Sequence, residues 1–266
     1  MVMTQSNSVQ ASRPQIVGLL ALAAQLLCAV PGWAQPITVA AASDLQSVMP
    51  QITERFQRET GHAVTLTFGS SGNFLAQIQN GAPFDVFFSA DIDYPKQLEM
   101  QALTEPGTLY EYAIGKIVVW TRADSGIDIR RGLAALDDPR VRRIAIANPA
   151  HAPYGRAAVA ALQKQQLYEK VRGKLVLGEN ISQAAQFVQS GNAEVGILAL
   201  SLALAPALAS TGSYAPIPEA LYPAIEQGAV ILRQSKNKNA ARQFLAFVKR
   251  PDVAGMLKQF GFTLPP

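Results

Sequence analysis

Two adjacent serines between glycines stand where a strand-like segment changes into a helix-like one. The stretch FGSSGNF, residues 68–74, follows the alternating run 63–68 and precedes the helical pattern 74–80. Hydroxyl groups and bare backbone N–H groups are hydrogen-bond donors, and a helix start adds unpaired N–H groups with about half a positive charge. Such a turn can cap its own helix or bind an anion.

Three other predicted helix starts have a similar composition. Ser43 precedes Gln46 with the spacing of a capping box, Asn180 precedes Gln183 in the same way, and HAPYG at 151–155 combines a proline with a glycine. Each follows a strand-like segment, so each is predicted at the edge of a sheet where open α/β folds bind ligands. Capping alone explains any single one. Together, directed at one point, they could bind a tetrahedral dianion with few or no lysines or arginines.

The sequence supports an enzyme less well than it supports a binding site. Gly69–Gly72 lacks the Gly-x-Ser-x-Gly spacing of a nucleophile elbow. The two histidines, His62 and His151, are too far apart in sequence for metal-ligand spacing, and His151 is expected to orient a binding loop. No phosphate-binding Gly-x-x-x-x-Gly-Lys-Ser/Thr motif occurs. A secreted hydrolase that uses Ser71 as nucleophile remains an alternative.

The acidic residues near these turns are interpreted as structural. Asp85 opens a strand, Asp91 can cap the next helix, and Asp93 follows it. Asp44 is the unusual case, because a carboxylate beside an anion site would repel a dianion, although it could accept a proton from a protonated oxyanion. We expect its side chain to interact favourably with the helix start and to face solvent.

Strand-like and helix-like segments alternate along the chain, which predicts an α/β fold with parallel sheets. The length fits two smaller lobes, and segments 110–116 and 214–223 are predicted to pass between them. The predicted strands are 37–41, 63–68, 85–88, 117–120, 144–146, 174–177 and 195–198. The predicted helices are 45–59, 74–80, 92–100, 155–169, 182–190 and 238–249.

The first 34 residues have the pattern of a cleavable signal peptide. Ile16–Val30 is an apolar run, shorter than the roughly 20 residues of a membrane span, and small residues follow at 32 and 34. Cleavage would remove Cys28, the one cysteine of the chain, so we expect no disulfide and no thiolate site in the remainder. The net charge of +4 is too small to indicate nucleic-acid binding.

Four blocks of sequence together resemble the periplasmic molybdate-binding proteins of ABC transporters, and the likeness extends over about residues 37–262. The blocks are AAASDL at 40–45, FGSSG at 68–72, QIQNGAPFDVFFSAD at 77–91 and NPAHAPYG at 148–155. The resemblance implies a type II periplasmic binding fold, in which two α/β lobes close on the anion. Lobe 1 would comprise 35–113 and 224–266, and lobe 2 would comprise 114–223.

Carried over residue by residue, the anion contacts of that family fall on Ser43 and Ser71, and on backbone N–H groups at Tyr154 and Ile181. Asp44, Gly72 and Asn180 form a second tier of candidates. The family performs no catalysis, uses no cofactor, and binds molybdenum only as its oxyanion, with no direct protein ligand. The sequence departs from the family at Ala199, where many members have tyrosine, and at Tyr154, where many have a small residue. A tyrosine is therefore expected on a different wall of the pocket.

The expected function is capture of molybdate, and of tungstate as well, in the periplasm, with delivery to an inner-membrane ABC permease. The protein is expected to be a monomer that binds no nucleic acid. The nearest alternative is the same fold with another ligand, such as sulfate, phosphate or an organic acid. The hydrolase that uses Ser71 is a second alternative, and a ligand-sensing domain of a regulator is a third, against which the signal peptide counts.

Overall fold

The computed structural model of the protein describes residues 1–5 and 35–266. Residues 1–5 form no helix or strand, and Gln35–Pro266 form a compact unit. The predicted signal peptide falls mainly on residues 6–34 and so lies outside the described residues. Among the described residues, no helix has both the length and the apolar character needed to cross a membrane.

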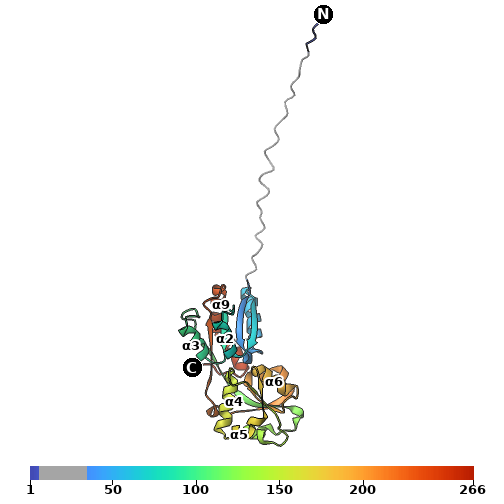
Figure 1. Cartoon of the computed structure of the whole chain (residues 1–266), viewed down its shortest axis with the longest axis vertical. Coiled ribbons are helices and arrows are strands. Elements are labelled where there is room, and N and C mark those ends of the chain that lie inside the picture. Colours follow the sequence, from blue (N-terminus) through green and yellow to red (C-terminus); the bar gives the residue numbers. More distant parts are fainter. Residues whose placement is uncertain (6–34) are drawn as a thin grey trace. The chain divides into compact units, whose positions relative to one another are not determined.

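The strands of Gln35–Pro266 form two five-stranded sheets (Figure 1). The first sheet has the order β2-β1-β3-β10-β4, and the second has the order β7-β6-β8-β5-β9. The first contains β1 (Ile37–Ala42), β2 (Val64–Gly69), β3 (Val86–Ser89), β4 (Tyr110–Gly115) and β10 (Ile225–Ile231). The second contains β5 (Ile117–Arg122), β6 (Ile144–Ala147), β7 (Leu175–Gly178), β8 (Val195–Ala199) and β9 (Gly212–Pro216). Each sheet with its helices is called a lobe below.

Both sheets are mixed, so the prediction of parallel sheets is only partly right. In lobe 1, β1 is parallel to β2 and β3, whereas β10 is antiparallel to β3 and β4. In lobe 2, β6 is parallel to β7 and β8, whereas β5 is antiparallel to β8 and β9. A strand-helix-strand crossover fixes a parallel direction. Strands β5 and β10 enter their sheets directly from the other lobe, without such a crossover.

The chain passes between the lobes at two places. Only Lys116 separates β4 of lobe 1 from β5 of lobe 2, and residues 217–224 lead from β9 back to β10. The predicted crossing segment 110–116 is therefore mostly the strand β4, and the first residues of the second predicted crossing belong to β9. Because the first connection is so short, the two sheets are held close together there.

Helices cover the sheets of both lobes, and Figure 1 labels α2, α3 and α9 on the first and α4, α5 and α6 on the second. Lobe 1 has α1 (Met49–Thr60), α2 (Ser71–Gln79), α3 (Asp93–Met100), α9 (Lys238–Val248) and α10 (Pro251–Gln259). Lobe 2 has α4 (Pro153–Lys164), α5 (Tyr168–Val171), α6 (Ile181–Gln189), α7 (Leu200–Ala203) and α8 (Pro206–Ala209). Short 3-10 helices are η1 (Ser43–Leu45), η2 (Ala123–Ser125), η3 (Ile129–Asp137), η4 (Arg172–Lys174) and η5 (Glu219–Leu221).

Two predicted helices are divided in the structure. The predicted helix 45–59 begins only at Met49, where Pro50 occupies the first turn, in which its missing N–H is tolerated. The single predicted helix 155–169 is interrupted after Lys164, because Gln166 has a left-handed backbone conformation with φ of 57°. The consequence for the site is that Ser43 lies in a 3-10 turn, ahead of the regular helix.

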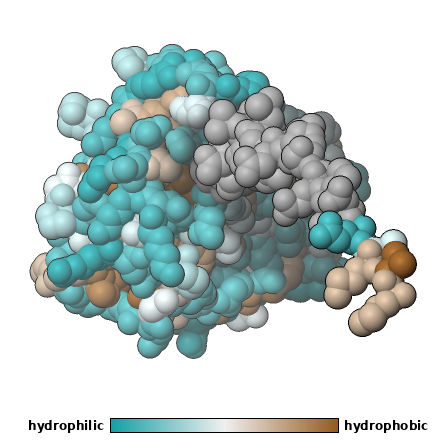
Figure 2. Space-filling view, turned by 90° about the horizontal axis from the view of Figure 1, so that it is seen from above, coloured by the Kyte–Doolittle hydropathy of each residue, from teal (hydrophilic) through white to brown (hydrophobic). Residues whose placement is uncertain are grey.

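Each lobe has its own hydrophobic core. In lobe 1, the ring of Phe244 on α9 packs edge-on against Phe56 of α1 and Phe88 of β3, with ring centroids 5.0 and 5.9 Å apart. In lobe 2, Trp120 of β5 is fully buried. The face of Gln35–Pro266 seen in Figure 2 is mostly hydrophilic. The core of lobe 2 also includes Ala42, Ala90 and Ile225 of lobe 1, so the two lobes share apolar contacts where they meet.

Candidate anion-binding site

A small cavity lies between the lobes where four helix starts meet. Lobe 1 contributes the starts of η1 and α2, and lobe 2 contributes the starts of α4 and α6. The four predicted first-tier contacts all line this cavity: Ser43, Ser71, Tyr154 and Ile181. Asp44 and Asn180 line it as well, whereas Gly72 is not among its lining residues. No lysine, arginine or histidine is among them either, so the cavity has no cationic side chain to attract an anion.

The backbone donors at this cavity come from the first turns of three helices. Ser71 and Ile181 are the first residues of α2 and α6, and Tyr154 is the second residue of α4. The N–H groups of these three residues have no hydrogen-bond acceptor within residues 35–266. Helix starts leave such groups unpaired and carry a partial positive charge, so they can donate to an oxyanion.

The two serine hydroxyls at the cavity are also available as donors. The Ser71 oxygen accepts a hydrogen bond from the backbone N–H of Ala90 at 2.9 Å, which fixes the oxygen and leaves the hydroxyl proton free. The Ser43 hydroxyl forms no hydrogen bond with any other residue that the structure describes, although Ser43 is buried. Because Ser43 lines the cavity, its hydroxyl can donate to an oxyanion bound there.

Helix capping, the simpler explanation of these turns, accounts for only one of the three side chains considered next, those of Asn180, Ser43 and Ser70. Asn180 is the cap of α6, since its Oδ1 accepts from the N–H of Gln183 at 3.0 Å, as predicted. Ser43 makes no capping bond, so the predicted capping box is wrong. Ser70 occupies the cap position of α2, but its hydroxyl donates to the carbonyl oxygen of His151 in lobe 2, at 2.6 Å.

Asp44 is fully buried at this cavity, which contradicts the expectation that it faces solvent. Its Oδ2 accepts from the Tyr154 hydroxyl at 2.9 Å and from Nε2 of Gln227 at 2.7 Å, while its Oδ1 has no partner among the described residues. Burial raises the pKa of Asp44 from 3.8 to about 6, although the donors Gln227 and Tyr154 lower it. The side chain turns inward because donors from both lobes meet there.

The Tyr154 hydroxyl is engaged with protein groups. It donates to Asp44 and also accepts from Nε2 of Gln227 at 3.0 Å. Burial raises the pKa of Tyr154 well above its usual value, so the hydroxyl stays a donor. The structure thus places this side chain at the Asp44 end of the pocket wall, and it is the backbone of Tyr154 that presents a free N–H.

Gln227 is a member of this site that the sequence did not reveal. It lies on β10, is fully buried, and its Oε1 accepts from the hydroxyl of Tyr112 on β4 at 2.7 Å. A buried amide of this kind must have its donors and acceptor satisfied. An isolated glutamine in a strand carries no sequence signal, so only the tertiary contacts identify it.

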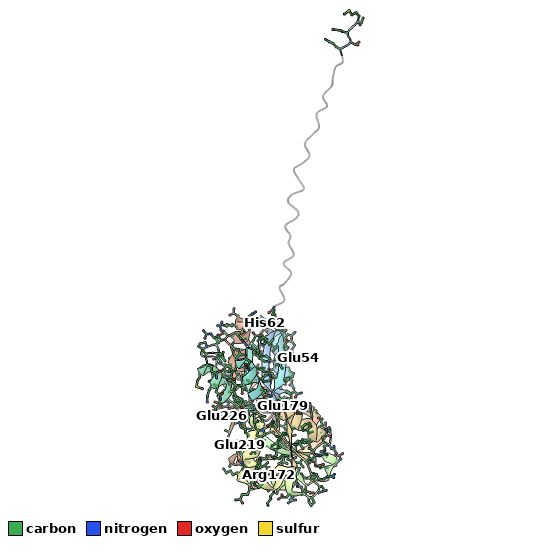
Figure 3. The ribbon with its side chains drawn as sticks, in the orientation of Figure 1. Glu54, His62, Arg172, Glu179, Glu219 and Glu226 are labelled. Carbon is green, nitrogen blue, oxygen red and sulfur yellow. The ribbon has the colours of Figure 1, made fainter. Side chains whose placement is uncertain are left out.

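Several hydrogen bonds join the two lobes around the cavity. The carbonyl of His151 accepts from the N–H of Gly72 at 3.0 Å in addition to the Ser70 hydroxyl. A Cβ atom on Gly72 would lie 2.6 Å from that carbonyl oxygen, so only glycine fits. Asn73 bonds to Glu179, which Figure 3 labels, and Arg156 of α4 pairs with Asp91 of lobe 1. The structure is therefore the closed arrangement of the lobes.

A larger cavity of about 390 Å³ lies beside the start of α4, but the one cationic side chain that lines it already has hydrogen-bond partners. Its one cation, Arg156, pairs with Asp91 and donates to the Tyr94 hydroxyl at 2.9 Å. Asp93 and Glu226 give the remaining wall an acidic character. An anion would be repelled there, so the smaller cavity is the better candidate. Within residues 1–5 and 35–266, no cluster of three or more His, Cys, Asp or Glu side chains could hold a metal ion.

Comparison with known proteins gives one consistent result. Residues 37–263 match the family described as bacterial extracellular solute-binding protein. The chain is 40% identical over 247 residues to the molybdate-binding protein ModA of Azotobacter vinelandii, covering 93% of this chain and 94% of that protein. It is 37% identical to ModA of Rhodobacter capsulatus, covering 92% and 95% of the two chains. The solved structure of the Azotobacter vinelandii periplasmic molybdate-binding protein superposes with a TM-score of 0.82 and 37% identity, covering 86% of this chain and all of that one.

Proposed function

This chain belongs to the bacterial extracellular solute-binding protein family, and we propose that it captures molybdate, with tungstate as a second ligand, for an ABC transporter. It acts in the periplasm and delivers the oxyanion to an inner-membrane permease. The observation that carries the ligand class is the cavity itself, where four helix starts and two serine hydroxyls converge without a cationic side chain.

Recognition in this proposal uses neutral donors only. The hydroxyls of Ser43 and Ser71 and the N–H groups at Tyr154 and Ile181 donate to the four oxygens of the anion. The molybdenum atom contacts no protein ligand, and the protein needs no cofactor. Partial charges at helix starts, in a site that excludes water, can stabilise a dianion without a lysine or arginine. Cavity size then favours molybdate over the smaller sulfate.

The hydrolase alternative has no geometric support, and the chain is not an enzyme. The Ser71 oxygen contacts the N–H of Ala90, and no histidine lies within hydrogen-bond distance of it in the described structure. His151 does contact the neighbouring Ser70, but the Ser70 hydroxyl donates to the His151 carbonyl. A proton directed to a backbone carbonyl is not positioned for transfer to a general base.

Thermal unfolding of the ligand-free protein, with molybdate, tungstate, sulfate and phosphate added in turn, tests the ligand. A ligand at 100 times its dissociation constant adds about 2.7 kcal/mol of stability, which raises Tm by roughly 5–10 °C for a protein of this size. We expect that shift with molybdate and tungstate but not with sulfate or phosphate.

A matched pair of variants links the shift to the site. Ser43→Ala, which removes an unpaired hydroxyl at the cavity, should reduce the shift, and Ser213→Ala, at an exposed position on β9, should retain it. A shift with sulfate or phosphate alone would replace molybdate with that anion. No shift with any of the four would refute oxyanion capture.

A further inference from the structure

The cavity proposed for a dianion contains a buried carboxyl group, and the two are incompatible if both are ionised. Asp44 is the residue after Ser43 and lines the same cavity. Two like charges in a buried site repel strongly, because the protein interior screens their interaction less than water does. One of the two must therefore lose its charge when the lobes close on the anion.

Both side chains that bond to the Asp44 carboxyl donate to the same oxygen. The Tyr154 hydroxyl and Nε2 of Gln227 both donate to Oδ2, and this fixes the carboxyl plane. Oδ1 is buried and has no partner among the described residues. A proton on the carboxyl would thus reside on Oδ1, which accepts no hydrogen bond from the described residues.

No cationic side chain lines the cavity beside the carboxyl. The elements packed against η1 are β2, α6 and α7, and none of them has an ionisable side chain. The ionisable groups that face Asp44 from other elements are the hydroxyls of Tyr112 on β4 and Tyr154 on α4, both buried and neutral. The nearest arginine on α4, Arg156, is already paired with Asp91.

We propose that Asp44 determines the specificity of the site by entering the closed complex as a neutral acid, with one proton taken up on Oδ1 for each dianion captured. This inference rests on the proposed function. In the open protein, Asp44 is ionised at neutral pH, and closure adds a proton to it from solvent. The cavity that results offers donors only, which suits a fully ionised oxyanion and disfavours hydrogen phosphate, whose own proton would find no acceptor.

The pH dependence follows from the sign of the shift. Burial raises the pKa of Asp44 in the closed form to about 6, against 3.8 for a free carboxyl, and a neighbouring dianion raises it further. The closed complex is therefore favoured at low pH and loses that advantage as pH rises through 6 and above. Between the two pKa values, one proton is bound per ligand, so the dissociation constant should rise about tenfold per pH unit.

Isothermal titration calorimetry with sodium molybdate tests the proposal. The heat is measured from pH 5 to 8 in buffers of different ionisation enthalpy, which gives the number of protons taken up. We expect close to one proton for the unaltered protein near pH 6. Asp44→Asn, which is neutral at every pH, should take up none, bind with a dissociation constant independent of pH, and bind more tightly than the unaltered protein at pH 8.

Asp91→Asn is the matched control, because Asp91 is another carboxylate at the lobe interface but has an arginine partner. It should retain the proton uptake, whatever its affinity. Molybdate binding by the unaltered protein without proton uptake would overturn this inference and leave the proposed function standing, and that measurement does not require the Asn variant to fold. An Asp44→Asn protein that binds more weakly than the unaltered protein at pH 8 would also overturn it. Absence of molybdate binding at every pH would overturn both.

Discussion

Adjacent serines at the start of α2 have different tasks. Ser70 donates its hydroxyl proton to the His151 carbonyl of the other lobe, whereas the Ser71 oxygen accepts from Ala90 and retains a free proton. Sequence alone treats them as equivalent, because both are small, polar and good at helix starts. Their backbone positions, one residue apart, direct one hydroxyl across the lobe interface and leave the other free at the cavity.

This difference predicts unequal effects of alanine at the two positions. Ser71→Ala removes a donor to a charged ligand, a contact worth about 1.5–3 kcal/mol, so molybdate affinity should fall roughly 10- to 100-fold. Ser70→Ala removes a neutral bond between the lobes, worth about 1 kcal/mol, and should weaken binding only severalfold. Titration calorimetry at one pH measures both. Equal losses would show that the free Ser71 proton has no special role.

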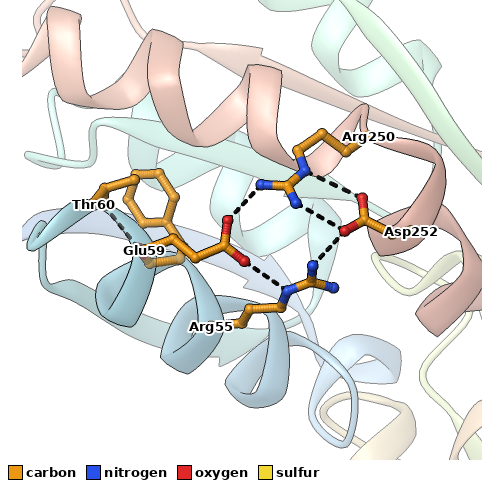
Figure 4. Close-up of polar contacts among 6 residues, drawn as sticks. Arg55, Glu59, Thr60, Arg250 and Asp252 are labelled. Atoms are coloured by element: carbon orange, nitrogen blue, oxygen red, sulfur yellow. Dashed lines mark hydrogen bonds and ion pairs between the residues drawn. The ribbon is translucent and has the colours of Figure 1, made fainter.

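An ion cluster joins the first helix of lobe 1 to the last (Figure 4). Glu59 of α1 pairs with Arg55 at 2.8 Å and with Arg250 at 2.6 Å, and Asp252 of α10 pairs with the same two arginines. Arg250, assisted by Arg55, lowers the pKa of Asp252 to about 2. The four charges thus connect residues nearly 200 positions apart, at a partly exposed surface.

Removing one charge from this cluster should have a small effect that depends on salt and pH. Exposed pairs contribute little, so Asp252→Asn should lower Tm by roughly 1–3 °C at low salt and by less in about 1 M salt. A carboxyl group whose pKa is lower in the folded than in the unfolded protein stabilises the fold at pH values above its unfolded pKa. That contribution is lost as pH falls below about 4. The difference in Tm between the variant and the unaltered protein should therefore become smaller in acid.

Thermal scans measure this difference in Tm. The control is Asp93→Asn, because Asp93 is an exposed acid paired only with Lys96. A difference that is as large in high salt as in low salt would contradict an electrostatic origin.

At the scale of the whole molecule, the closed arrangement depends on backbone contacts between the two lobes. The close approach of Gly72 to the His151 carbonyl is one of these contacts. Such a contact forms only when the lobes close, so it should influence ligand binding without affecting the folding of either lobe.

Gly72→Ala tests this separation of folding from closure. The added Cβ would lie 2.6 Å from the His151 oxygen, which prevents full closure, while alanine in the first turn of α2 is a better helix former than glycine. Molybdate affinity should fall more than tenfold, and the Tm of the ligand-free protein should stay the same or rise slightly. Gly255→Ala, with open space around it on α10, should leave affinity unchanged. Unchanged affinity in Gly72→Ala would mean that the lobes bind the ligand without this contact.

The sequence by itself determined the local features of this protein. The alternation of apolar strands and amphipathic helices gave the α/β class, and the resemblance gave the two-lobed binding fold, which the comparisons confirm. Polar and glycine-rich turns identified the helix starts that carry Ser71, Tyr154 and Ile181, because helix starts depend on neighbouring residues. That these residues contact the anion stays a prediction.

Only the tertiary structure decided the features that depend on distant residues. Asp44 accepts from Tyr154, 110 positions away, and from Gln227, 183 positions away, and no local pattern could show that it is buried. The direction of β10, the cross-lobe task of Ser70 and the fit of Gly72 against His151 have the same origin. Local sequence specifies backbone propensity, whereas burial and charge state depend on which segments the fold brings together.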